Sequence, residues 1–168
     1  ESGLAVITPH PAAHARWADK RLLAWLGDDE LLQQAGLGVD DRSHLRQTIP
    51  ATEVVEPAAA DDLWQRRKSL FFKPVDGFGS KAAYRGDKLT RTTFEHILAH
   101  RYVAQALAPT SFRRIQSADG VEADLRVDVR NYAMHGATWL RAARLYRGQT
   151  TNFRTTGGGF APVLTLPA

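Results

Sequence analysis

The stretch from Ser69 to Tyr84 holds the residues best suited to bind an anion. Lys73 lies in a run of apolar and aromatic residues that predicts a buried strand, and the sequence Gly77-Phe78-Gly79-Ser80-Lys81 follows it. Burying an unpaired ammonium group is costly, so we expect Lys73 to face negative charge. Glycines let main-chain N–H groups approach an anion closely. The stretch therefore favours a phosphate site, although a glycine-rich turn between strands is also typical of a plain hairpin.

A second group of candidates lies in a predicted strand over residues 122–134. Four charged residues alternate there with apolar ones: Asp124, Arg126, Asp128 and Arg130. They either form a solvated sheet face with cross-strand ion pairs or face a ligand. The next predicted strand, 138–146, places Arg141 and Arg144 on opposite faces, and one of the two can join the charged face.

Three further polar features are open to two interpretations each. Gln105 interrupts an apolar strand at 101–107, and it bonds either to neighbouring backbone or to a ligand. The polar segment with three glycines at 157–159 is either a flexible tail or backbone held close to a ligand. His96 and His100 have a spacing that suits a metal, but no third ligand accompanies them, and we interpret them as helix surface.

The elements that position these residues alternate between helices and strands, as in an α/β or α+β protein. One helix is predicted over 12–26, a short one over 28–35, and a polar, turn-rich segment over 38–46. An extended segment at 49–55 leads to a helix from Pro57 to Arg67. After the strand with Lys73 we expect a strand at 81–84 and a helix that begins at Thr90 and buries Phe94 and Ile97. The remaining predicted strands are 101–107, 112–115, 122–134, 138–146 and a short one at the end.

Composition bounds the class of protein. The chain has 168 residues, 43% of them hydrophobic and 24% charged, no cysteine and a net charge of +4. No apolar run approaches the roughly 20 residues that span a bilayer, so we expect no membrane partner and a cytoplasmic location. The basic residues do not cluster beyond Arg66-Arg67-Lys68 and Arg113-Arg114, which makes nucleic-acid binding an unfavoured alternative. Because Glu1–Pro11 begins without methionine, we interpret the chain as a fragment.

Taken in order along residues 19–163, these features resemble the ATP-grasp family. The resemblance implies an α+β fold of two small lobes, with mainly antiparallel sheets and flanking helices around a nucleotide cleft. It divides the chain into a helical lead-in at 1–66, a central lobe at 67–107 and a C-terminal lobe at 108–168. It also implies an ATP-dependent ligase that activates a carboxylate as an acyl-phosphate for attack by an amine, with small-molecule or peptide substrates.

The resemblance also implies roles for particular residues. Phosphate contacts come from the basic and loop residues Lys20, Lys73, Gly79, Ser80 and Lys81. Adenine is read at the hinge that contains Gln105, by backbone groups of residues such as Ala106 and Leu107. Arg126 meets the transferring phosphate, and we place Arg144 beside it as a second catalytic candidate. Asp128 and the amide oxygen of Asn152 hold Mg²⁺, which prefers oxygen ligands.

Two departures from the family pattern bear on activity. Thr150 stands where the family usually has a metal-bridging glutamate, with Gln149 as the nearest analogue. The family's preceding domain, which helps to bind the acceptor, is also missing from these residues. A catalytically reduced nucleotide-binding or regulatory module is therefore the main alternative to a ligase, and a basic nucleic-acid-binding α/β domain is the third.

Overall fold

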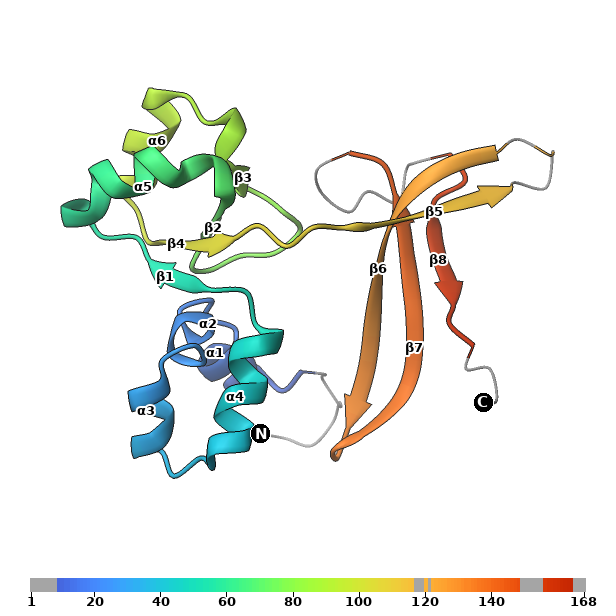
Figure 1. The fold of residues 1–168 in the computed structure, drawn as a ribbon, viewed down its shortest axis with the longest axis horizontal. Helices are drawn as coiled ribbons and strands as arrows, with labels where there is room; N and C mark the ends of the chain where they lie inside the picture. Colours follow the sequence, from blue (N-terminus) through green and yellow to red (C-terminus); the bar gives the residue numbers. More distant parts are fainter. Residues whose placement is uncertain (1–8, 117–119, 121, 149–155, 165–168) are drawn as a thin grey trace. The chain divides into compact units, whose positions relative to one another are not determined.

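The computed structural model describes residues 9–116, 120, 122–148 and 156–164. The chain forms two compact units, unit 1 over Glu1–Ala108 and unit 2 over Pro109–Ala168. It is an α+β protein with two four-stranded antiparallel sheets and several short helices (Figure 1). The predicted α+β class with mainly antiparallel sheets is confirmed.

Unit 1 contains one sheet and all of the described helices. Its strands are β1 (Thr52–Val54), β2 (Leu70–Pro74), β3 (Tyr84–Arg85) and β4 (Tyr102–Ala106), in the order β1-β4-β2-β3. The α-helices are α1 (Pro11–Trp17), α2 (Leu22–Trp25), α3 (Asp29–Gln34), α4 (Val39–Thr48), α5 (Ala60–Arg66) and α6 (Arg91–Leu98), and the short 3-10 helices are η1 (Pro57–Ala59), η2 (Arg67–Ser69) and η3 (Gly86–Lys88). Figure 1 shows α5 and α6 together on one side of the sheet, whereas α2, α3 and α4 lie beyond β1.

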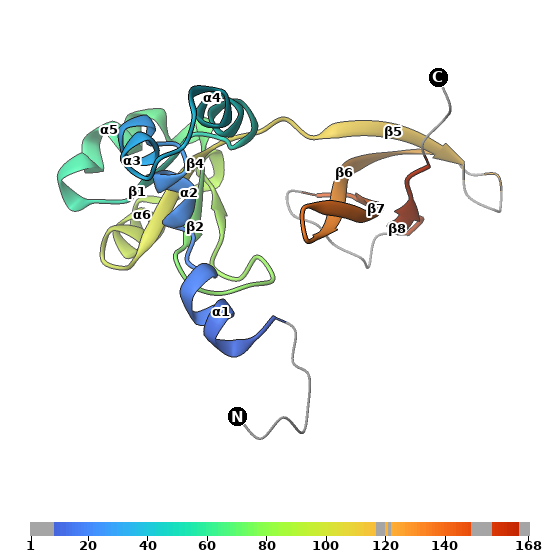
Figure 2. The same ribbon diagram turned by 90° about the horizontal axis from the view of Figure 1, so that it is seen from below.

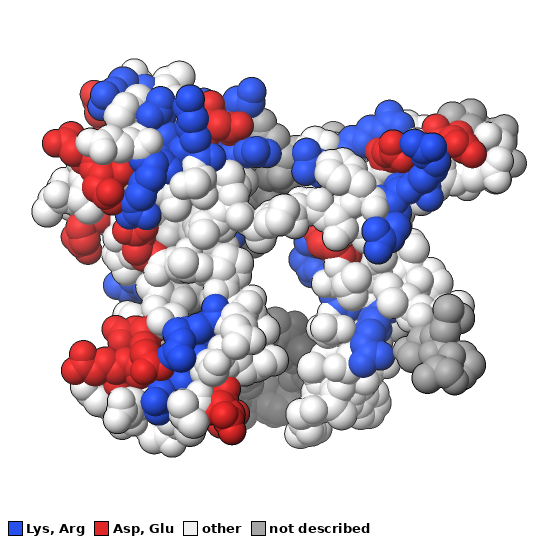
Figure 3. All heavy atoms as spheres, viewed as in Figure 1, with Lys and Arg blue, Asp and Glu red and all other residues white. Residues whose placement is uncertain are grey.

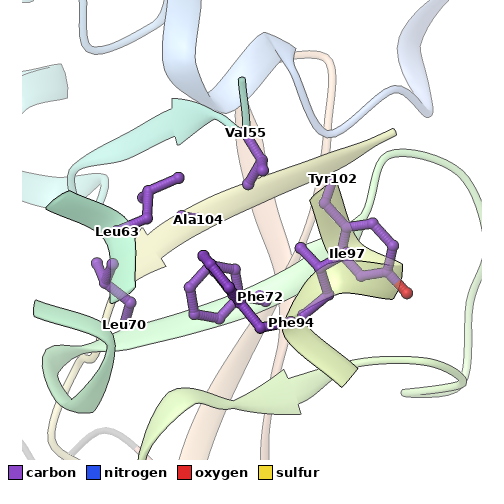
Figure 4. Close-up of a cluster of buried hydrophobic side chains, with 8 residues drawn as sticks. All are labelled: Val55, Leu63, Leu70, Phe72, Phe94, Ile97, Tyr102 and Ala104. Carbon is purple, nitrogen blue, oxygen red and sulfur yellow. The ribbon is translucent and has the colours of Figure 1, made fainter. Parts of the chain in front are cut away.

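The core of unit 1 lies between its sheet and the helices α5 and α6. Successive residues of a strand point to opposite faces, so Leu70 and Phe72 of β2 face these helices. The Phe72 ring meets Phe94 of α6 edge-on, with ring centroids 5.9 Å apart (Figure 4). Each fully buried side chain of this size contributes about 1.5–3 kcal/mol. Helix α6 follows Thr90, whose hydroxyl accepts a hydrogen bond from the Thr93 N–H at 3.2 Å, so the predicted helix start is confirmed.

Two predictions for the N-terminal helices are wrong. The single helix expected over 12–26 is divided into α1 and α2, because the Asp19 carboxylate accepts a hydrogen bond from the Arg21 N–H at 2.8 Å and competes with helical bonding. The segment 38–46, expected to be polar and turn-rich, lies in helix α4 from Val39 onward, with Gly38 as the N-cap. Asp40 and Asp41 in the first turn of α4 and Arg46 in the last complement the helix dipole.

The strand predicted at 81–84 is also wrong in its bounds. Strand β3 consists of Tyr84–Arg85, and the residues before it form a loop that stands out from the sheet (Figure 2). Ser80 and Ala82 have positive φ angles of 58° and 53°, which no strand tolerates. The glycine-rich loop is therefore longer than the sequence pattern indicates.

Unit 2 is a meander of four strands. They are β5 (Ser111–Gln116), β6 (Glu122–Met134), β7 (Ala137–Tyr146) and β8 (Gly159–Pro162), paired in sequence order. A two-residue turn joins β6 to β7, with φ angles of 51° at His135 and 76° at Gly136, as a tight hairpin requires. Leu125, Ala142 and Tyr146 are buried. The predicted long charged strand and its hairpin partner are confirmed.

Candidate functional site

One face of the sheet in unit 1 carries polar side chains. Phe71 and Lys73 alternate with the core residues of β2 and so lie on the face away from α5 and α6. Register places Gln105 of β4 directly opposite both Phe71 of β2 and Thr52 of β1. Three strands that are distant in sequence thus bring Thr52, Gln105 and Lys73 onto one face.

These three side chains are joined by hydrogen bonds. The Lys73 ammonium donates to Gln105 Oε1 at 2.5 Å, and Gln105 Nε2 donates to Thr52 Oγ1 at 2.8 Å. Gln105 is only 8% exposed, so these partners satisfy an amide that is largely removed from water. The sequence suggested a backbone or a ligand partner for Gln105, and the structure instead shows two side chains. Lys73 accordingly meets a neutral oxygen within the protein rather than an acid.

Lys20 approaches the same region from the segment between α1 and α2. Its ammonium donates to the carbonyl oxygens of Gly77 at 3.0 Å and Val75 at 3.4 Å, where the chain leaves β2 for the loop. Burial lowers the pKa of the Lys73 amine, and the positive charge of Lys20 lowers it further. The charges of the two ammonium groups thus interact, and both groups donate to neutral oxygens. This arrangement favours a bound anion, which would relieve their repulsion.

Asp19, which precedes Lys20, is engaged elsewhere. Both of its carboxylate oxygens accept from Arg21 Nε, at 3.1 and 3.0 Å, and one accepts from Arg21 Nη2 at 2.6 Å. These hydrogen bonds hold the pKa of the Asp19 carboxyl below its ordinary value. Asp19 therefore neutralises Arg21 and fixes the segment that carries Lys20.

Four residues of the loop after β2 have positive φ angles. Gly77 and Gly79 have φ angles of 102° and 68°, followed by positive φ at Ser80 and Ala82. A residue with a side chain costs roughly 1–2 kcal/mol in this conformation, and such strain is common where backbone amides meet a ligand. Phe78 is 82% exposed, and the Lys81 ammonium lies 5.9 Å from the centre of its ring. Lys20 holds the start of this loop through the Val75 and Gly77 carbonyls.

The hinge after β4 differs from what the resemblance implies. The Ala106 N–H donates to the Ala51 carbonyl at 2.7 Å, and the Leu107 N–H donates to the Ser69 carbonyl at 2.9 Å. Both amides are therefore used within unit 1. An adenine at this hinge would have to be read by carbonyl oxygens of these residues or by a neighbouring amide.

In unit 2 the charged face of β6 forms a tight ion pair. Asp128 lies opposite Arg144 of β7, and its two oxygens accept from Arg144 Nε at 2.5 Å and Nη2 at 2.8 Å. These hydrogen bonds raise the pKa of Arg144. Arg126, two residues before Asp128, lies with its guanidinium 4.9 Å from the centre of the Phe112 ring. Of the two arginines left open by the sequence, Arg144 joins the charged face, while Arg141 lies opposite Asn131.

The charges of β6 also support the interpretation of this strand as a solvated sheet face, because they form cross-strand ion pairs. Arg114 of β5 contacts Asp124 at 3.1 Å, in an exposed pair next along the strand. Asn152, Thr150 and Gln149 lie outside the described residues, as does any contact they make with Asp128. Within the described ranges, no group of three or more His, Cys, Asp or Glu side chains is placed to hold a metal ion.

A separate cavity of about 320 Å³ in unit 1 contains none of the predicted site residues. Its walls include the apolar residues Val54, Val55, Pro57, Val75 and Leu98, with Arg21 and Arg101 among the polar ones. Both arginines contact Asp19, at 2.6 and 3.7 Å. Asp19 thus partly neutralises the two arginines, and we do not include this cavity in the candidate site.

No protein-family model matches this chain, and no curated protein matches it in sequence. Each helix among the described residues is too short or too polar to cross a lipid bilayer. The functional argument therefore rests on the geometry of the two units.

Thr52 is a site residue that the sequence did not single out, since it lies in a segment predicted only as extended. The pairing of β1 with β4, which places Thr52 opposite Gln105, identifies it.

Proposed function

We propose that this chain is the ATP-binding portion of an ATP-grasp ligase that activates a carboxylate for attack by an amine. The observation that carries the proposal is the pair of ammonium groups, Lys20 and Lys73, whose hydrogen-bond partners are neutral oxygens. Neither ammonium forms an ion pair with an acid among the described residues, and the two charges repel each other, so a triphosphate would supply favourable negative charge. The strained Gly77–Ala82 loop, which begins where Lys20 binds, adds backbone donors.

Unit 2 supplies the groups that suit phosphoryl transfer. In this proposal Arg126 and Arg144 stabilise the negative charge that develops on the transferring phosphoryl group. Asp128 offers the hard carboxylate oxygens that Mg²⁺ prefers, and the Asn152 amide would complete the set. These oxygen ligands fit Mg²⁺. Both Asp128 oxygens accept hydrogen bonds from Arg144, so the carboxylate must give up this partner to bind a metal. A bound Mg²⁺ neutralises phosphate charge and orients the phosphates.

The same ion pair favours a second candidate, a nucleotide-binding module without turnover. Asp128 is already satisfied by Arg144, and Thr150 replaces the usual acid, so metal binding would be weaker than in an active ligase. A nucleic-acid-binding domain is less well supported. On the face in Figure 3, basic and acidic side chains are mixed over α3, α4 and α5 rather than forming a basic stripe.

The binding test is a calorimetric titration of the chain with Mg·ATP, comparing wild type with Lys73→Met and Lys68→Met. Lys73→Met removes a charge-assisted phosphate contact, so we expect affinity to fall by about tenfold to a hundredfold. Lys68 is exposed in η2 and serves as the control with wild-type affinity. Equal affinities of the three proteins would refute the placement of the nucleotide on this sheet face.

Turnover separates the two nucleotide-binding candidates. A ligase releases ADP only when a carboxylate and an amine are both supplied, which a coupled ADP assay on the full-length protein would detect. A regulatory module binds Mg·ATP without releasing ADP. Salt-sensitive binding of RNA or DNA with no response to ATP would support the nucleic-acid alternative instead.

A further inference from the structure

The hydrogen bonds around Gln105 have only one consistent direction. An ammonium group can only donate, so the amide must present Oε1 to Lys73 and Nε2 to Thr52. The Thr52 oxygen accepts from Gln105, and its own hydroxyl proton goes to the Pro50 carbonyl at 2.8 Å. The series thus runs from Lys73 of β2 through Gln105 of β4 to Thr52 of β1, and it ends on backbone.

Thr52 is well suited to hold this series in place. Its β-branched side chain has few rotamers, and the strand register sets it directly across from Gln105. If its oxygen were removed, Gln105 Nε2 would lose its acceptor while nearly buried, and the amide would shift to regain one. The oxygen that holds the Lys73 ammonium would move with it.

The neutral charge of Gln105 matters as much as its geometry. A carboxylate in its place would neutralise Lys73 and compete with an incoming anion, whereas an amide oxygen orients the ammonium and leaves its charge available. Among the described residues, the charge that acts on Lys73 is that of Lys20, from the segment before α2. Two further pairs lie nearby. Arg85 of β3, opposite Phe71, contacts Asp87 at 3.2 Å, and Asp76, between the two residues that bind Lys20, contacts Arg101 at 3.6 Å.

We propose that Thr52 is a positioning residue for Lys73, and that through Gln105 it fixes where the ammonium meets an anionic ligand. As a contribution to nucleotide binding this rests on the proposed function, but the hydrogen-bonded series itself does not. Thr52→Val keeps the shape and removes the acceptor, and Thr52→Ser keeps the hydroxyl. Thr138→Val, an exposed position on strand β7, is the matched control.

The first measurement is the affinity of the chain for Mg·ATP by calorimetry. We expect Thr52→Val to weaken binding about tenfold, the ratio expected for losing roughly one hydrogen bond, and Thr52→Ser to restore it to within about twofold. Thr138→Val should bind as wild type does. Wild-type affinity in Thr52→Val would overturn the proposal, and so would an equal loss of affinity in the valine and serine variants.

The second measurement is the NMR titration of the Lys73 side-chain nitrogen without nucleotide. Loss of the oriented amide oxygen stabilises the ammonium less, so the pKa of Lys73 should fall in Thr52→Val and stay unchanged in Thr52→Ser. If wild type fails to bind Mg·ATP, the proposed function is wrong, and this titration still decides the role of Thr52. An unchanged Lys73 titration in a folded Thr52→Val protein would then reject it.

Discussion

Gly86, the first residue of η3, permits a close backbone approach in unit 1, and Gly86→Ala tests the packing around β2. A β-carbon built at this position would overlap the carbonyl oxygen of Arg67 and lie 2.7 Å from its carbonyl carbon and 3.0 Å from the Leu70 oxygen. Gly86 is buried, and the atoms it would strike are backbone, which cannot rotate away. The glycine is therefore required by close packing between η2 and η3.

The cost follows from the displacement that alanine would impose. Restoring an ordinary carbon–carbon contact of about 3.5 Å requires the backbone of η2 to move by about 0.8 Å from the 2.7 Å position, and more for the oxygen. Overpacking of this kind costs about 1–3 kcal/mol, or more when backbone must shift. Alanine recovers at most about 1 kcal/mol by restricting the unfolded chain. Because the Arg67 oxygen must move farther than its carbon, we take the upper end of the overpacking cost, about 3 kcal/mol or more, and expect a net loss of at least about 2 kcal/mol in the free energy of unfolding.

Urea unfolding followed by far-UV circular dichroism measures this loss. The expected change is a large part of a total stability of about 5–15 kcal/mol, so the variant should remain folded but unfold at lower urea concentration. Gly38→Ala is the control, because the nearest atom to its β-carbon, Asp41 Oδ2, is 3.9 Å away, and we expect a change of at most about 1 kcal/mol. A loss below about 1 kcal/mol in Gly86→Ala, equal to that of the control, would refute the packing argument.

Two further predictions concern charge. Because the pKa of Lys73 lies below the ordinary value of 10.5, the unfolded chain binds more protons just below that pH. The stability associated with Lys73 should therefore rise as pH increases toward 10.5, and the difference in unfolding free energy between wild type and Lys73→Met should show that rise; a pH-independent difference would contradict it. Asp128→Asn leaves Arg144, whose side chain is 19% exposed, without its carboxylate and should cost about 1–2 kcal/mol in urea unfolding. Asp124→Asn in the exposed pair with Arg114 should cost less, and equal costs would contradict the difference in burial.

Local patterns in the sequence were sufficient to predict most of the strands and one helix start. The alternation of charged and apolar residues in β6 and the apolar run of β2 depend on neighbours one or two positions away, and Thr90 caps α6 from three residues away. The same local reasoning failed at residues 18–21. There the hydrogen bond that the Arg21 backbone N–H donates to the Asp19 carboxylate competes with continuation of the helix.

The candidate site was predictable as residue types but not as a set of partners. Lys20, Lys73 and the glycine-rich loop stand out by composition, and the structure joins Lys20 to the loop at Gly77. The ion pair of Asp128 with Arg144 required the register of β6 against β7, since a shift by one residue would have brought Arg141 to that face instead.

The sequence by itself determined that this chain has a strand with a lysine that is unfavourable to bury unpaired, a loop that tolerates positive φ, and a strand with one charged face. These are properties of short segments, set by side-chain period and backbone freedom. Only the tertiary structure decided that Lys73 is held by Gln105 and Gln105 by Thr52, because these residues are 32 and 53 positions apart. Hydrogen bonds across a sheet depend on which strands pair and in what register, and packing of the whole unit sets both.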